Sequence, residues 1–141
     1  MADKIQTLEN LKKIAHHKVE EVQKELGETA AAIAHLADKA TKKEQAIKHE
    51  EENMPDDLDM RAHFERFEKR ARVEINTIQD EILTLRQHEA HLRDQLAEHF
   101  AEEKRYKILL ERKQAELKKE REKKNQSQLD EIAAERHTQK H

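Results

Sequence analysis

The stretch Asn53-Met54-Pro55-Asp56-Asp57-Leu58-Asp59 is the place in this sequence where a helical pattern has to stop. Pro55 is the only proline; it lacks a backbone N–H, and its ring drives the preceding residue, Met54, out of the α region. On both sides of this stretch, apolar residues recur at helical spacing for dozens of positions. We therefore interpret the stretch as the hinge between two helices.

The fold class that follows is all-α: an antiparallel two-helix coiled-coil hairpin with unequal arms, in which the second helix overhangs the first. We predict a single coiled-coil domain over residues 1–141, with helices at 3–52 and 60–124 and a hinge at 53–59. A pause after residue 124 is expected to leave a short helical segment or a frayed tail over 125–141.

Composition supports long helices and excludes a globular core. Charged residues make up 42% of the chain, hydrophobic residues 35% and aromatic residues 3%, with 28 basic and 31 acidic side chains interleaved. The absence of cysteine excludes disulfides and thiolate metal sites and fits a reducing compartment. The amino terminus lacks the apolar core of a signal peptide, and the longest apolar run, 30–34, is too short to span a membrane.

A narrow apolar seam runs along both predicted helices. Its residues alternate at spacings of three and four, which is the a/d pattern of a coiled coil. Such a seam buries few large side chains, so the hairpin should be marginal alone, and a parallel homodimer of extended chains is the competing packing. The seam comprises Ile5, Leu8, Ala15, Val19, Val22, Leu26, Ile33, Leu36, Ala40 and Ile47 in the first helix, and Phe64, Ala71, Ile75, Ile78, Ile82, Leu85, Leu92, Leu96, Leu110 and Leu117 in the second. Polar residues interrupt it at Lys12, Thr29, Lys43, Glu89 and Glu103.

Charge is distributed unevenly along the hairpin. Glutamates at 50–52 and the aspartates Asp56, Asp57 and Asp59 make the hinge acidic, and Asp56 or Asp57 can cap the second helix. Residues 104–124 contain ten basic and four acidic side chains, a net charge of about six positive.

Folding back at residue 56 makes position i face roughly residue 112 minus i, so everything after about Leu110 should lack a partner within the chain. Leu109, Leu110 and Leu117 would then form an uncovered apolar strip suited to a partner groove.

The histidines give no catalytic pattern, and the one pair with the i,i+4 spacing of a metal site, His137 and His141, falls in the predicted tail. The ten histidines include no Glu-x-x-His pair, and His88-Glu89-Ala90-His91 lacks the spacing of a zinc protease helix. One glycine cannot build a phosphate-binding loop, and a single seam offers no water-excluding pocket. We therefore expect a non-enzymatic protein with no cofactor, no metal and no small-molecule ligand.

Taken together, the order and spacing of several short runs resemble the flagellar type III export protein FliJ and its coiled-coil stalk family. The resemblance covers nearly the full chain. It rests on Leu8…Leu11-Lys12…Ala15, Lys18-Val19-Glu20, Leu26-Gly27-Glu28, Glu111-Arg112-Lys113 and the ending Leu129-Asp130-Glu131-Ile132-Ala133-Ala134 followed by Arg136.

The resemblance implies a cytoplasmic stalk at the cytoplasmic face of the inner membrane, with its open end in a hexameric export ATPase and its hinge region facing the export gate; export chaperones are further partners associated with the family. Carried over by position, the ATPase-binding residues would be Leu8, Leu11, Leu109, Leu110, Leu117, Lys118, Lys119, Arg121, Asp130 and Glu131, and the gate-binding residues Phe64 and Phe67. The sequence departs from the family pattern at Lys39, Lys43 and Ala46, where more apolar residues are expected.

Two other functions stay open at the level of sequence. A homodimeric structural tether or scaffold would use the same seam in trans. Binding of nucleic acid through the basic helix is disfavoured because that stretch has one aromatic residue for stacking and the chain as a whole carries a net charge of −3.

Overall fold

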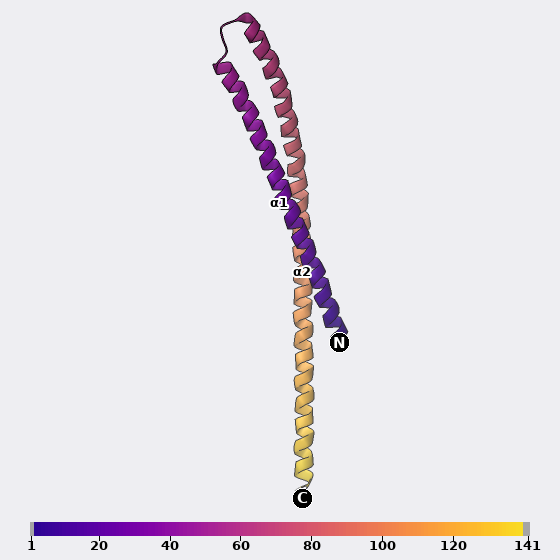
Figure 1. The fold of residues 1–141 in the computed structure, drawn as a ribbon. Coiled ribbons are helices and arrows are strands. Elements are labelled where there is room, and N and C mark those ends of the chain that lie inside the picture. Colours follow the sequence, from indigo (N-terminus) through magenta and orange to yellow (C-terminus); the bar gives the residue numbers. More distant parts are fainter. Residues whose placement is uncertain (1, 140–141) are drawn as a thin grey trace. The chain divides into compact units, whose positions relative to one another are not determined.

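The computed structural model describes residues 2–139 and contains two helices. Helix α1 spans Ala2–Glu52 and helix α2 spans Leu58–Gln139, joined by the short connection visible in Figure 1. The chain is an antiparallel two-helix hairpin with the longer helix second, which confirms the predicted fold class. Its packing divides into two compact units: unit 1 comprises Met1–Val19 and Glu98–His141, and unit 2 comprises Glu20–Ala97. Each unit contains a piece of both helices.

The hinge in unit 2 is built as the sequence predicts, although it is shorter. Helix α1 ends at Glu52, and both the backbone N–H and the side-chain amide of Asn53 donate to the His49 carbonyl, at 3.1 and 2.8 Å. Helix α2 begins at Leu58 because Asp57 caps it: the Asp57 carboxylate accepts from the Asp59 N–H at 3.1 Å. The hinge therefore occupies residues 53–57.

The coiled-coil seam is confirmed in both units. All the seam positions predicted above are buried or half-buried, and so are the five polar positions that interrupt them. In unit 2, Ile47, Ala71 and Ile75 form a buried cluster against which Phe64 and Phe67 pack. Buried Thr29 is tolerated because its hydroxyl donates to the Glu25 carbonyl at 2.8 Å within the helix.

Helix α2 differs from the prediction at its C-terminal part. We expected a pause after residue 124, whereas the helix continues without interruption to Gln139. Asn125 and Ser127 are weak helix formers but not helix breakers, Gln126 is a good helix former, and its side chain donates to Asp130 one turn later at 3.2 Å. Without a glycine or proline, nothing in this segment stops the helix.

The register in unit 1 also differs from the fold-back arithmetic. His16 contacts Glu103 at 2.9 Å, whereas the rule places His16 opposite residue 96. Side chains that flank a seam reach along the helix by about a turn, so simple counting from the hinge underestimates how far α2 is covered. The corrected limit is Leu117, which is half-buried; residues 118–139 are all exposed.

Candidate partner-binding surfaces

Unit 1 presents apolar side chains beside the seam, where the two helices leave shallow hollows. One hollow is lined by Leu8, Leu109 and the stems of Lys4 and Lys113, and Leu109 is 44% exposed. Leu8 of α1 and Leu109 of α2, which the resemblance assigns to the ATPase ring, thus line the same hollow. Leu11 is half-buried in the same unit.

The predicted apolar strip of Leu109, Leu110 and Leu117 needs a correction. Leu110 is buried, at 9% exposed, and Leu117 is half-buried, so only Leu109 is substantially uncovered. The reason is the register: α1 begins at Ala2 and its first turns lie against this part of α2. Leu110 therefore holds the two helices of unit 1 together and offers little surface to a partner.

Among the other exposed apolar residues of unit 1, two aliphatic side chains escape sequence reasoning. Ile14 is 54% exposed and lies beside a hollow that also includes His16, Glu103 and Leu110; Ile108 is 37% exposed. Neither residue follows the a/d spacing. The sequence does not indicate that such an aliphatic side chain is exposed until the seam positions have been assigned.

The basic part of unit 1 extends past the hairpin. Lys118, Lys119 and Arg121 are exposed, and so are Asp130 and Glu131 further along the same helix. Leu129 and Ile132 are 60% and 47% exposed there. The helix from 118 to 139 thus offers charged and apolar groups that no other part of the described chain covers.

The predicted gate residues lie in unit 2 and are half-buried. The rings of Phe64 and Phe67 are tilted at 41° with centroids 6.5 Å apart, and both pack against the buried cluster that includes Ile47. They hold the two helices together close to the hinge. Their remaining exposed surface is what a partner could contact.

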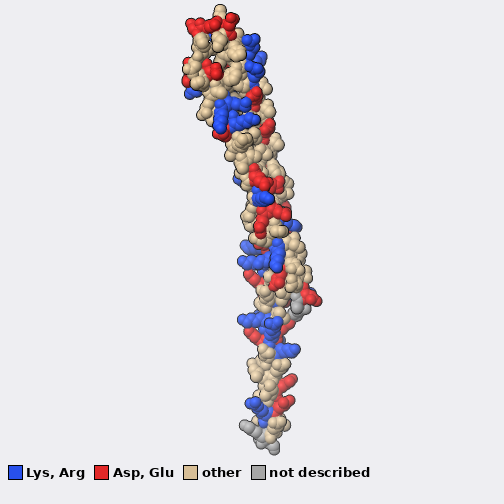
Figure 2. Space-filling view, in the orientation of Figure 1, with Lys and Arg blue, Asp and Glu red and all other residues tan. Residues whose placement is uncertain are grey.

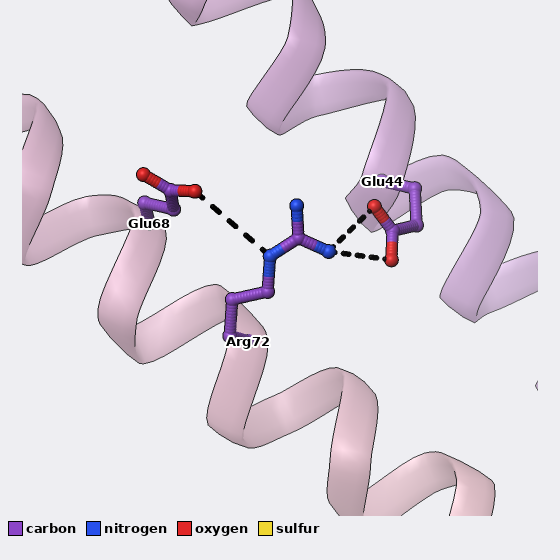
Figure 3. A network of polar contacts seen from close by, with 3 residues as sticks. All are labelled: Glu44, Glu68 and Arg72. Atoms are coloured by element: carbon purple, nitrogen blue, oxygen red, sulfur yellow. Dashed lines mark hydrogen bonds and ion pairs between the residues drawn. The ribbon is translucent and has the colours of Figure 1, made fainter.

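Beside these rings, ion pairs bridge the helices of unit 2. Arg72 donates to both carboxylate oxygens of Glu44 at 2.8 Å and lies 4.0 Å from Glu68, as Figure 3 shows. Lys43 donates to Glu74 and, chiefly through this hydrogen bond, lowers the pKa of that carboxyl from its usual range. The sequence flags Lys43 as a departure from the family pattern, and the structure gives it an intramolecular role.

Within residues 2–139, no group of three or more histidine or acidic side chains is placed to hold a metal ion. In the same described part of the chain, neither helix has a segment long and apolar enough to cross a membrane.

The fold and the surfaces define a class: a two-helix coiled-coil hairpin with an exposed helical extension. The family model described as the flagellar FliJ protein matches residues 4–141, and the chain belongs to the FliJ family. This family is a non-enzymatic component of the flagellar export apparatus. No curated protein and no solved structure gives a significant match to the chain.

Proposed function

We propose that the chain is a cytoplasmic stalk of the flagellar export apparatus, peripheral at the inner membrane, whose unit 1 inserts into the hexameric export ATPase. The observation that supports this is the extension of α2: residues 118–139 are helical and exposed. A helix in a partner groove uses apolar anchors flanked by charge. Leu129 and Ile132 supply such anchors, and Lys118, Lys119 and Arg121 supply the charge.

The roles of the individual residues follow from their exposure. Leu8, Leu11 and Leu109 contact the ring through the apolar surface of unit 1, whereas buried Leu110 and half-buried Leu117 keep the helices paired behind that surface. Asp130 and Glu131 contact basic groups of the ring from the exposed helix.

The same proposal assigns unit 2 to the export gate. The exposed parts of the Phe64 and Phe67 rings provide the contact, next to the Lys43–Glu74 ion pair. Because these rings also pack on the core, the gate contact and the closure of the hinge share the same side chains. Export chaperones are a third class of proposed partner, and no surface is assigned to them.

The test is co-purification with the export ATPase and measurement of its hydrolysis rate. Reversal of charge at Lys118, Lys119 and Arg121 to glutamate should reduce association and stimulation at least tenfold, because several close charge pairs across an interface are lost together. The matched control reverses Lys24, Lys48 and Arg86, which are exposed cations of unit 2. Equal association of both triple variants would contradict insertion of this helix.

The gate contact has a separate test. Phe67→Leu keeps most of the apolar volume, so the hairpin should stay folded by circular dichroism, while an aromatic contact would be lost. Reduced binding to the cytoplasmic domain of the gate protein with unchanged ATPase stimulation is the expected result. If Phe67→Leu binds the gate protein as tightly as the parent chain does, Phe67 is not part of the gate contact.

A further inference from the structure

The hinge end of unit 2 carries an exposed apolar side chain surrounded by carboxylates. Leu58, the first residue of α2, is 83% exposed, which makes it the most exposed large aliphatic of the described chain. We call its surroundings the acidic cap: Glu50, Glu51, Glu52, Asp56, Asp57 and Asp59, all of which are exposed. Figure 2 shows acidic side chains gathered at the hinge end. Leu58 therefore contributes little to packing within the hairpin.

A basic strip lies a few turns further along the same helix. His63, Arg66, Lys69 and Arg70 line a shallow hollow together with Val73, which is 61% exposed. Arg66 and Lys69 are both exposed. Figure 2 shows basic side chains next to the acidic hinge. The strip thus combines an apolar centre with positive charge, which is the complement of Leu58 in its acidic cap.

The cap and the strip cannot meet within one molecule. Leu58, Ala62, Lys69 and Val73 are spaced by four, seven and four residues, so they share the face of α2 that points away from the seam. The fifteen residues from Leu58 to Val73 separate the two features by about 22 Å on a helix. Because the acidic cap and the basic strip lie on one face of one helix, each can contact its complement only on another molecule.

We propose that the acidic cap of one molecule docks onto the basic strip of a second copy of this chain. When two α2 helices lie antiparallel on their outer faces, Leu58 of each copy meets Val73 of the other. The contact then occurs twice about a two-fold axis, as an isologous interface requires. Charge complementarity steers the two copies together and fixes their orientation.

The length of helix involved sets the strength of this dimer. One face of about four turns buries well under the roughly 800 Å² per partner of a standard interface, so the dimer is weak and forms only at high local concentration. Molecules gathered at one assembly would meet that condition. The inference stands apart from insertion into the ATPase, because it uses unit 2 and leaves residues 118–139 free.

Cysteine cross-linking tests the geometry, and the chain offers a clean background because it contains no cysteine. A mixture of Leu58→Cys and Val73→Cys molecules should form a disulfide-linked dimer much faster than a mixture of Leu58→Cys and Leu83→Cys molecules. Leu83 is the matched control, since it is also on α2 of unit 2 and is 59% exposed. Equal rates for both mixtures would overturn the proposed contact.

Charge reversal tests the chemistry on the full chain by sedimentation equilibrium. The strip variant carries Arg66→Glu, Lys69→Glu and Arg70→Glu. The variant of the acidic cap carries Glu51→Lys and Glu52→Lys. Asp57 is left unchanged because it is the N-terminal capping residue of α2. The parent should dimerise with increasing concentration and lose that association at high salt, while each variant alone stays monomeric. Mixing the variants should restore one of the two contacts and a partial dimer. A monomeric parent at every concentration, or a strip that binds an acidic peptide but not a second copy, would refute the proposal.

Discussion

Replacing Ile75 by alanine should destabilise unit 2 more than any comparable change on its surface. Ile75 is 2% exposed and packs in one buried cluster with Ile47 and Ala71, close to the hinge. The substitution removes three carbon atoms from the place where α1 and α2 meet.

The expected loss follows from burial. At about 0.8 kcal/mol per buried methylene, three carbons account for about 2.4 kcal/mol, and an unfilled cavity would add to this value. Phe64 and Phe67 pack on the same cluster and are only half-buried, so they can move into part of the space. We therefore expect a decrease in the free energy of unfolding of about 2 to 3 kcal/mol.

Urea denaturation followed by circular dichroism at 222 nm measures this loss. The control is Leu83→Ala on the same helix, where the side chain is 59% exposed and the change should stay within about 0.5 kcal/mol. If Ile75→Ala leaves too little folded protein to fit, Ile75→Val should cost about 0.5 to 1.5 kcal/mol on the same scale. Equal costs for Ile75→Ala and Leu83→Ala would mean that the seam is not the core. A midpoint that rises strongly with protein concentration would mean that the seam pairs between chains, as in the homodimeric scaffold.

Three further changes test single features of the hairpin. Gly27→Ala should raise the free energy of unfolding by about 1 kcal/mol, because Gly27 is helical with nothing within 4 Å of an added Cβ; unchanged thermal stability would contradict this. Thr29→Val should change stability by less than about 1 kcal/mol in urea, since the lost hydroxyl bond to the Glu25 carbonyl is local and the site is apolar; a large loss would give that bond a wider role. Because the pKa of Glu74 is lowered in the folded state, its ion pair with Lys43 stabilises the fold fully above the ordinary carboxyl pKa of about 4.3. That stabilisation is lost as the pH falls through the lower folded pKa. Lys43→Met should therefore flatten the acid-side loss of stability, measured by acid titration of the circular dichroism signal.

The seam and the hinge could be predicted from sequence because each depends on local or periodic information. Pro55 fixes the end of the first helix through covalent geometry, and Asp57 caps the second through a contact two residues away. The a/d spacing identifies even Thr29 and Lys43 as seam positions, although neither is apolar. The alternating spacing of three and four residues identifies a seam position even where the side chain at that position is polar.

The register at the open end could not be predicted from the same pattern. Moving one helix by a heptad leaves a/d residues facing a/d residues, so the spacing does not decide which turn meets which. His16 against Glu103 and the burial of Leu110 depend on that choice. The continuation of α2 through Ser127 depends on small propensity differences that sum over many residues, and no single residue announces it.

The exposed helix of residues 118–139 bears on function because its sequence is not needed for the fold. Contacts with α1 do not constrain it, so its helicity rests on propensity and on local pairs such as Gln126 with Asp130. A helix that contacts only solvent could be polar at every position. Leu129, Ile132 and Ala133 instead place three apolar side chains within five residues, at the i, i+3, i+4 spacing of one face. Apolar side chains that are not buried within the chain are exposed to water unfavourably, and a groove on a partner would bury them. These exposed apolar side chains support assigning the end of α2, rather than the acidic hinge, to the ATPase ring.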